Sequence, residues 1–463
     1  CGGCVRRFHG IQIKNPACMK ISKLRLRNYK GFGHDSEEIS FLDNNGKPND
    51  ITVLVGENAS GKSSILQAVA MLIGGAVRPR FRPSGLDWPG FGFDSLESGR
   101  FPMEVSCDLQ FSEEEISATH ALVEAIKDQI PHYLAPGRSK EIELHLNYAE
   151  DMVHSLGGPA ARSQARGYQY ALQQPAAARW DALQRVGKIF WYSEQRTSSS
   201  IVARAFDDEM SSVGISDKDL RDILGKWSNL HYRIKGSDAL PHNDPFAELD
   251  RLMGLVFPGK RLVGAAPKRN PSQVLEDEDF WLRDDRSGME YELANMSAGE
   301  RSILPILIDF VNWNIDNSIV LIDEVELHLH PPLQQVLMDA LPKLGKNNQF
   351  ILTTHSPHVI AKLKPEQVKV VKDFKVTGLQ KATKGRDVNA ILTEVLGIAK
   401  RPPEYAEKLK RFYALLETRS MEAAKDIFNA LEQDWGMMDT EIVRARHFLE
   451  DLQDELAGER GAL

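Results

Sequence analysis

The sequence is poor in several features that mark special classes of protein. It has four cysteines in 463 residues, too few for a disulfide framework, which indicates a reducing compartment such as the cytosol. No apolar run approaches the roughly 18 residues that a membrane span needs, and the first residues lack the long apolar core of a signal peptide. We therefore expect a cytoplasmic protein that contacts no membrane.

The sequence also has no excess of positive charge. The formal net charge is −8, so the chain as a whole does not attract nucleic acid, and any such contact must be a local patch. Hydrophobic residues make up 42% and charged residues 26% of the chain, which is typical of a soluble globular protein. The length allows two or three domains, or one domain with a large insertion.

Three of the cysteines, Cys1, Cys4 and Cys18, lie before Met19. Cys-x-x-Cys is a usual half of a zinc site, but no second pair follows at the spacing of a zinc finger. Met19 begins a stretch, MKISKLRLRNYKGFG, that looks like a natural start. We therefore expect residues 1–18 to be a translated leader or an added extension.

The most informative pattern is a glycine loop between a strand and a helix. Residues 51–55 are largely apolar, residues 56–63 match G-x-x-x-x-G-K-[ST], and an apolar helical run follows. In this context the N–H groups of the loop and the helix N-terminus bind phosphate, Lys62 reaches the outer phosphates, and Ser63 ligates Mg²⁺. We assign ATP binding to Gly56, Glu57, Asn58, Ala59, Ser60, Gly61, Lys62, Ser63 and Ser64.

A second apolar strand, residues 318–322, ends in two acids, Asp323 and Glu324. Two carboxylates at the end of a buried strand are costly if they serve packing alone. As a Walker B motif they have a purpose, because Asp323 holds Mg²⁺, directly or through water, and Glu324 polarises the attacking water. The sequence therefore predicts ATP and Mg²⁺ as cofactors and ATP hydrolysis as the reaction.

Three motifs resemble those of the RecF, SMC and OLD branch of ABC-type ATPases. Residues 24–32 match L-x-L-x-N-[FY]-[KR]-G-F, residues 295–300 contain [LM]-S-x-G-[EQ], and residues 323–331 match D-E-x-E-x-x-L-H-P. The resemblance implies an α/β fold, namely an ABC-type P-loop NTPase head with a mixed sheet flanked by helices. It also implies that the opening hairpin flanks the nucleotide base.

The resemblance gives the MSAGE stretch a role in a partner subunit. In this family the signature serine and the helix N-terminus cap the γ-phosphate held by the phosphate loop of the other subunit. The corresponding residues here are Ser297, Ala298, Gly299 and Glu300. A capping box formed by Ser297 and Glu300 would explain both residues without that role.

The resemblance also assigns catalytic residues. His355 follows an apolar strand and fits the switch histidine that hydrogen-bonds the γ-phosphate, so Lys62, Glu324 and His355 are the expected catalytic residues. His328 and His330 are spaced like metal ligands, but we interpret them as part of the loop that contacts the partner subunit.

Several features stay open at this stage. The glutamine of the family's glutamine loop is Gln195 or Gln110. Arg78, Arg80 and Arg82 form either a contact to a phosphate backbone or a solvated loop. Eight basic and two acidic residues between Lys362 and Arg386 make either a nucleic-acid face or a solvated hairpin.

The secondary-structure signals divide the chain into five parts. Residues 113–130 follow a capping box and are expected to be helical, and residues 155–180 lack apolar periodicity and are a candidate mobile segment. In the last part we expect helices at 387–396, 403–417, 421–433 and 439–455. The parts are an extension (1–18), an N-terminal ATPase lobe with the phosphate loop (19–111), an inserted and mostly helical subdomain with some core strands (112–290), a C-terminal ATPase lobe (291–386) and a helical C-terminal extension (387–463).

The overall layout resembles the stand-alone ATPases of the Septu and retron defence systems. GRDVNAILTEVLG, an Arg-Pro-Pro turn and VRARHFLEDL carry this likeness. OLD nucleases continue with a Toprim domain that holds an Asp-x-Asp pair, whereas Septu ATPases work beside an HNH nuclease. The resemblance implies a homodimer or higher homo-oligomer with an HNH-type nuclease partner, and DNA is a further candidate partner.

We therefore expect an ATPase whose nucleotide-driven dimerisation gates a nuclease or DNA engagement in bacterial anti-phage defence. One alternative is a DNA repair ATPase like RecF or SMC, and another is a nucleotide-gated scaffold with little hydrolysis. A small-molecule kinase would fit the glycine loop but would leave the signature and switch motifs unexplained.

Overall fold

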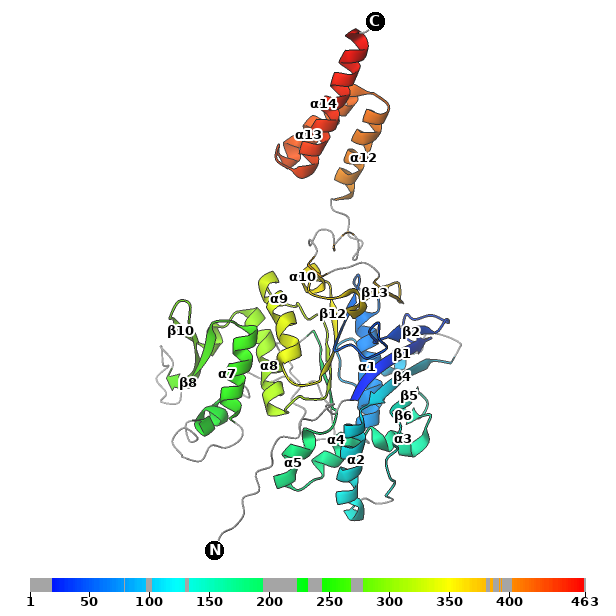
Figure 1. Ribbon diagram of the computed structural model, residues 1–463, viewed down its shortest axis with the longest axis vertical. Coiled ribbons are helices and arrows are strands. Elements are labelled where there is room, and N and C mark those ends of the chain that lie inside the picture. Colours follow the sequence, from blue (N-terminus) through cyan, green and yellow to red (C-terminus); the bar gives the residue numbers. More distant parts are fainter. Residues whose placement is uncertain are drawn as a thin grey trace. The chain divides into compact units, whose positions relative to one another are not determined.

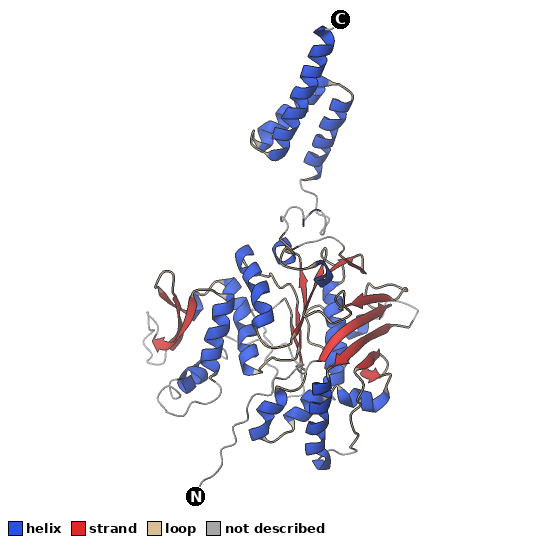
Figure 2. Cartoon of the chain, viewed as in Figure 1, coloured by secondary structure: helices blue, strands red, loops and turns tan. Residues whose placement is uncertain are grey.

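Helix α1 (Lys62–Val77) is the element around which the larger part of the chain is built. In the computed structural model, α1 packs against strands of two β-sheets and is buried along almost its whole length. Figure 1 shows α1 beside the strands, and Figure 2 shows how helices and strands are distributed. The structure describes residues 19–78, 80–96, 102–129, 133–194, 223–231, 244–267, 278–379, 384–385, 391, 393 and 402–461.

The first sheet is mainly parallel. It contains β3 (Ile51–Val55), β7 (Ile189–Tyr192), β11 (Ile319–Ile322), β12 (Gln349–Thr354), β13 (Val368–Lys372) and β14 (Lys375–Gly378). The order is β14-β13-β3-β12-β11-β7, and only the edge pair β13–β14 is antiparallel. Every residue of β3, β7, β11 and β12 is buried, as expected for parallel strands covered on both faces.

The second sheet is antiparallel, with the order β2-β1-β4-β5-β6. Its strands are β1 (Met19–Arg27), β2 (Glu37–Ser40), β4 (Glu104–Phe111), β5 (Glu141–Asn147) and β6 (Met152–Ser155). Buried and partly exposed residues alternate along β5, because one face packs on α1 and the other carries polar side chains. The side chain of Gln349 joins the two sheets, since it accepts from Ile21 N–H at 2.8 Å and donates to Ile21 C=O at 2.9 Å.

A small antiparallel sheet and several helices complete the first unit. The sheet has the order β10-β9-β8, and its neighbour α7 packs on α8 and α9. The bounds are β8 (Lys260–Pro267), β9 (Glu278–Asp284), β10 (Glu290–Glu292), α7 (Pro245–Val256), α8 (Ala298–Asn312), α9 (Pro331–Ala340) and α10 (Pro357–Ile360). The stretch expected to be a mostly helical insertion therefore supplies strands to all three sheets.

Residues 155–180, named above as a candidate mobile segment because they lack apolar periodicity, have regular secondary structure. They form α3 (Gly158–Gln164) and α4 (Gly167–Leu172) and begin α5 (Ala176–Leu183). These helices have only 7, 6 and 8 residues, so none is long enough to display a helical period of apolar positions. Their packing against α1, α2 (Glu113–Ala125) and β6 supplies the order that the pattern does not reveal.

The capping box expected at helix α2 (Glu113–Ala125) is only half formed. Ser112 accepts from Glu115 N–H at 3.2 Å, as predicted, and the helix ends earlier than residue 130. The Glu115 side chain instead points into the core and accepts from Gly187 N–H at 2.8 Å. Burial raises the pKa of Glu115 to about 8, so this side chain serves a core contact rather than the helix end.

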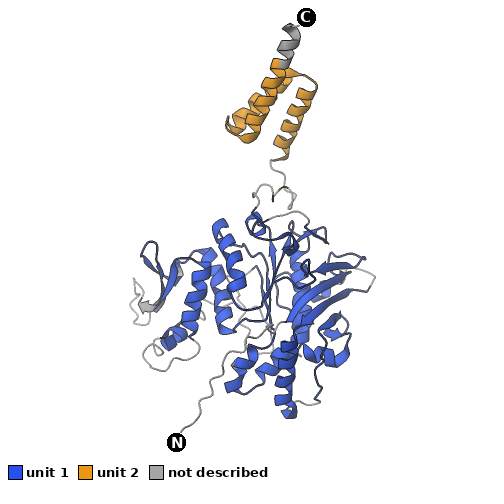
Figure 3. Ribbon diagram, viewed as in Figure 1, with its two compact units in different colours: residues 1–388 blue, residues 389–463 orange. Residues whose placement is uncertain are grey.

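The last residues form a separate unit. The chain divides into residues 1–388 and 389–463 (Figure 3). In the second unit α12 (Pro403–Glu417), α13 (Met421–Trp435) and α14 (Thr440–Gly461) pack around Phe412, Phe428 and Leu431. Three of the four expected helices are therefore confirmed, and the one at 387–396 falls outside the described residues apart from isolated positions.

Some expectations concern residues that the structure does not describe, among them Cys1, Cys4, Cys18 and Gln195. Within the described ranges, no helix is both long enough and apolar enough to cross a membrane.

Candidate nucleotide site

The phosphate loop, Gly56–Ser63, follows β3 directly, and its last two residues begin α1, as predicted. The loop passes so close to β13 that a Cβ atom on Gly56 would lie 2.0 Å from the carbonyl oxygen of Val371. Lys62 Nζ donates to the carbonyl oxygens of Gly56 at 3.1 Å and Glu57 at 2.7 Å, so its ammonium group is held inside the loop. The Oγ atom of Ser60 is buried and has no hydrogen-bond partner, which leaves a polar atom free for a ligand.

The strand order brings the phosphate loop next to the end of β11. Ser63 Oγ donates to Asp323 Oδ1 at 3.1 Å, although 260 residues separate them in the sequence. Thr353, at the end of the intervening strand β12, donates to the same oxygen at 2.5 Å. A serine hydroxyl and a carboxylate side by side are hard oxygen ligands, so this pair fits a magnesium ion that takes its other ligands from phosphate and water.

Glu324 is held in position by its backbone. It adopts a left-handed conformation with φ of 46°, and its N–H group donates to Thr353 Oγ1 at 2.7 Å. Burial raises the pKa of Glu324, and the neighbouring carboxylates of Asp323 and Glu326 raise it further. A carboxylate with a raised pKa is a better proton acceptor than an ordinary one, as a general base for water requires.

His355 and Lys62 face the same group of acids. Burial lowers the pKa of His355, and the Lys62 ammonium lowers it further, so the imidazole is neutral at pH 7. Burial also lowers the pKa of Lys62, while Asp323 and Glu324 oppose this effect. The structure thus brings together all the residues predicted for the phosphate and water-activating half of the site.

Two residues of this half were not predicted. Thr353 contacts both Asp323 and Glu324, and the only sequence signal for it is its place at the end of an apolar strand, before His355. Glu326 accepts from His355 N–H at 2.5 Å, while its other oxygen is buried without a partner. Glu326 lies in the D-E-x-E-x-x-L-H-P motif, but the motif alone did not predict its contact with His355.

A hollow of about 330 Å³ lies beside the phosphate loop. Lys30 and Gly31 of the opening hairpin line it, and the expectation that this hairpin flanks the nucleotide base stays a prediction. Phe374 lines it from the β13–β14 turn, where its N–H donates to Ser60 C=O at 3.2 Å and its ring packs edge-on against Phe32 at 5.4 Å. Phe374 therefore belongs to the site, although no motif indicated it.

The signature turn, Ser297–Glu300, begins helix α8 at a different place. Glu300 N–H donates to Ser297 Oγ at 3.3 Å and Ser297 N–H donates to Glu300 Oε2 at 3.2 Å, so the predicted capping box forms completely. Ser297 and Ala298 are exposed, and none of the four residues lines the hollow beside the phosphate loop. The motif is thus present, but not in its own chain's phosphate site.

The loop after β11 supports the signature turn. A Cβ atom on Gly299 would lie 2.4 Å from the carbonyl oxygen of His328, so only glycine fits there. The side chains of His328 and His330 are exposed. Within the part of the chain that the structure describes, no group of three or more His, Cys, Asp or Glu side chains is arranged to hold a metal ion. Gln110 lies in β4, paired with Lys20, and does not line the hollow.

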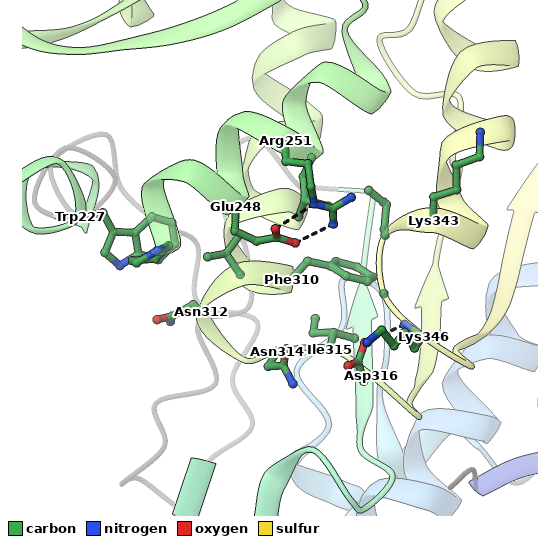
Figure 4. A pocket seen from close by; sticks show the side chains of 15 residues that line it. Trp227, Glu248, Arg251, Phe310, Asn312, Asn314, Ile315, Asp316, Lys343 and Lys346 are labelled. Atoms are coloured by element: carbon green, nitrogen blue, oxygen red, sulfur yellow. Dashed lines mark hydrogen bonds and ion pairs between the residues drawn. The ribbon is translucent and has the colours of Figure 1, made fainter. Parts of the chain in front are cut away.

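A larger cavity of about 630 Å³ lies elsewhere, between α7, the end of α8 and the turn before β12 (Figure 4). An ion pair between Glu248 and Arg251 forms part of its wall, with Lys343, Lys346 and Asp316 on the other side. None of the predicted nucleotide residues lines it, so it is separate from the nucleotide site.

A glycine loop between a parallel strand and a helix, with two carboxylates at the end of a nearby parallel strand, defines a P-loop nucleoside triphosphatase. Two family models match the chain, "AAA domain, putative AbiEii toxin, Type IV TA system" over residues 177–361 and "AAA ATPase domain" over residues 19–155. The predicted fold class is confirmed, and the protein is an ATPase.

Curated relatives cover most of the chain. The "Retron Ec83 probable ATPase" of Escherichia coli is 32% identical over 92% of this chain and 86% of that protein. The "Retron Vc95 probable ATPase" of Vibrio cholerae is 22% identical over 76% of this chain and 74% of that protein. The "Septu protein PtuA" of Bacillus mycoides is 30% identical over 32% of this chain and 22% of that protein.

The chain therefore belongs to the family of AAA ATPases that includes the Retron Ec83 probable ATPase, as its motifs predicted. Among solved structures, the SMC head bound to the C-winged helix domain of ScpA aligns with 78% of this chain and 98% of that chain, at 16% identity and a TM-score of 0.43.

Proposed function

We propose that two copies of this chain close head to tail around two ATP molecules, and that hydrolysis opens the pair again. The observation that carries this proposal is the separation between the two halves of the motif set. Lys62, Asp323 and Glu324 meet in one chain, whereas Ser297 and Ala298 are exposed at the start of a 15-residue helix. An exposed helix N-terminus binds anions well, so it suits the γ-phosphate held by a second copy.

Each residue has a defined task in this arrangement. The Lys62 ammonium offsets charge on the β- and γ-phosphates, and the neutral His355 imidazole donates a hydrogen bond to the γ-phosphate. Glu324 accepts a proton from the water that attacks phosphorus. Mg²⁺, when bound next to Ser63 and Asp323, neutralises charge that develops on the phosphate oxygens.

The test replaces the proposed base. Glu324→Gln keeps the size and removes the proton acceptor, so ATP turnover should fall about 100-fold or more. ATP binding should persist, because Lys62 and the loop are unchanged. Light scattering in ATP and Mg²⁺ should therefore show a stable dimer of the variant, where the wild type dimerises only transiently.

The matched control adds Lys62→Ala to Glu324→Gln. This double variant has lost the cation that holds the phosphates, so it should remain monomeric in ATP. Unchanged turnover in Glu324→Gln would support the scaffold alternative. Lost turnover without any ATP-dependent dimer would overturn the proposal that a second chain completes the site.

The shape change gates a nuclease partner of the HNH type in anti-phage defence. Support for this step comes from the names of the retron and Septu relatives and from the resemblance of the chain to ATPases that work beside such a nuclease. DNA binding by the chain alone, measured at several salt concentrations, separates this role from DNA repair. Strong, salt-dependent binding by the chain alone favours repair, whereas DNA engagement only with the nuclease favours defence.

A further inference from the structure

A third pocket, lined by arginine, lies at the end of α1 opposite to the phosphate loop. It has a volume of about 400 Å³ and is walled by α3, α4 and the end of β6. Arg162 and Arg166 both line it, and Arg162 Nη2 donates at 3.4 Å to the carbonyl oxygen of Gly75 in the last turn of α1. Figure 1 shows α3 beside β6 and α4 beside α2. We call this cavity the arginine pocket.

Neither arginine pairs with an acid among the residues that the structure describes. Arg166 bonds to the hydroxyl group of Tyr170, and Tyr170 in turn contacts Ser163 Oγ at 2.6 Å. The Nε atoms of Arg162 and Arg166 are both buried and have no acceptor. Arg25, by contrast, is neutralised by an acid, because it forms a bidentate ion pair with Asp108 at 3.0 and 2.7 Å.

The charge in the arginine pocket is therefore uncompensated. Burial, together with repulsion from Arg166 and Arg82, lowers the pKa of Arg162 to about 10, so the guanidinium is still charged at pH 7. Burial also lowers the pKa of Arg166. Two partly buried cations without a counter-charge are unfavourable in an empty pocket, and an anion removes that cost.

The rest of the lining fits a ligand with one charged end. Ser155 lines the pocket and is nine-tenths buried, and its buried Oγ atom has no hydrogen-bond partner among the residues that the structure describes. His154 also lines the pocket, and its Nε2 atom lies 2.7 Å from Glu150 Oε2. Glu150 thus contacts a lining residue but does not line the pocket itself. Val123 and Leu134 supply an apolar side.

We propose that the arginine pocket binds the phosphate group of a small molecule of about the size of a nucleoside monophosphate. Guanidinium groups match phosphate with two parallel hydrogen bonds each, and the Ser155 hydroxyl adds one more. The apolar side takes the uncharged part of the ligand. A concave pocket of this volume is typical of small-molecule sites, whereas a nucleic-acid backbone is followed by an open basic groove.

The test needs a chain in which the ATP site cannot bind the probe. Lys62→Ala removes the phosphate-loop cation and serves as the background for every variant. AMP, pyrophosphate and adenosine are titrated calorimetrically into this protein. AMP and pyrophosphate should bind one per chain, and adenosine, which lacks a phosphate, should not.

Arg162→Gln with Arg166→Gln should weaken AMP binding at least about tenfold, because the charge-assisted hydrogen bonds to phosphate are lost. The matched control is Arg185→Gln, which removes an exposed arginine outside the pocket and should leave AMP binding unchanged. If the double variant does not fold, Ser155→Ala is used instead, and it should weaken AMP binding by a smaller factor.

Three outcomes contradict the proposal. The first is that neither AMP nor pyrophosphate binds the Lys62→Ala chain. The second is that binding survives the loss of both arginines. The third is that a single-stranded oligonucleotide binds through these arginines at least about tenfold more tightly than AMP, which would make the pocket a nucleic-acid contact.

Discussion

The phosphate-loop half and the signature half of this ATPase are built in opposite ways. Around the phosphate loop, Ser63 and Thr353 each donate to Asp323 from distant positions in the sequence, and Asp323 and Thr353 are buried. In the signature turn, the hydrogen bonds join Ser297 and Glu300, which are only three positions apart. The first two residues of the turn, Ser297 and Ala298, are exposed. A turn whose polar groups are satisfied locally and whose side chains are exposed can contact another molecule, and this difference is what the proposal of a second chain at the site rests on.

The most severe test of this comparison mixes two inactive chains. Lys62→Ala damages the phosphate loop, and Ser297→Arg puts bulk and charge into the signature turn. In a head-to-tail pair each variant alone damages both sites, so each should lose at least about 100-fold of ATP turnover. A mixed pair has one doubly damaged site and one intact site. Mixing equal amounts should restore about one quarter of wild-type turnover, because half of the symmetric pairs are mixed.

The control for the mixing experiment combines both substitutions in one chain and mixes it with the wild type. Such a pair has one defect in each site, so it adds no turnover beyond that of wild-type pairs. If the two single variants stay inactive when mixed, the signature turn does not act on the partner's nucleotide.

The motifs located the phosphate-loop half in detail, because each of its residues follows a strand that its apolar run reveals. Lys62, Asp323, Glu324 and His355 were all placed in this way. Thr353 was missed, since a threonine at the end of a buried strand has no pattern of its own. Its role depends on the order of the strands, which sets β12 between β3 and β11 and which a single sequence does not show.

Other misses have a similar origin. Phe374 reaches the nucleotide hollow from a turn that follows the last motif, so only the pairing of β13 with β3 brings it there. The Glu115 side chain does not complete the Ser112 capping box, because it accepts instead from the buried backbone N–H of Gly187, 72 residues away. Local patterns therefore predict strands, loops and helix starts, whereas contacts between distant segments decide where polar side chains go.

The Thr353→Val substitution tests the phosphate-loop half of the comparison, and we expect a moderate effect on stability and Mg²⁺ affinity. The substitution removes the donor to Asp323 and the acceptor for Glu324 N–H, so it should lower the free energy of unfolding by about 1–3 kcal/mol. As an outer support of the proposed magnesium ligand, Thr353 should also affect Mg²⁺ affinity by about tenfold. Chemical denaturation and the Mg²⁺ dependence of turnover measure the two effects.

The matched control is Thr52→Val, in the neighbouring strand β3. Thr52 is fully buried, but its hydroxyl has no hydrogen-bond partner, so this variant should retain its stability and Mg²⁺ affinity. Equal losses in the two variants would mean that any change in these strands disturbs the site, and that Thr353 has no special role.

The smallest expected effect is a shift in pH dependence. The carboxylates of Asp323 and Glu326 raise the pKa of Glu324 in addition to the effect of burial. A general base must be deprotonated, so turnover should rise with pH through this raised pKa, above the ordinary value of 4.5. Glu326→Gln removes one negative charge and keeps an acceptor for His355 N–H, so the acid limb of the pH–rate profile should move to lower pH by up to about one unit.

Glu300→Gln provides the comparison on the signature side. Glu300 is not among the charges that act on Glu324, so the midpoint of the acid limb should stay where it is in the wild type, even if the rate itself falls. A shift in Glu326→Gln alone assigns the limb to a group on which the Glu326 charge acts, namely Glu324 or His355. Equal shifts in both variants would assign it to the nucleotide, and Glu324 would then lose its support as the base.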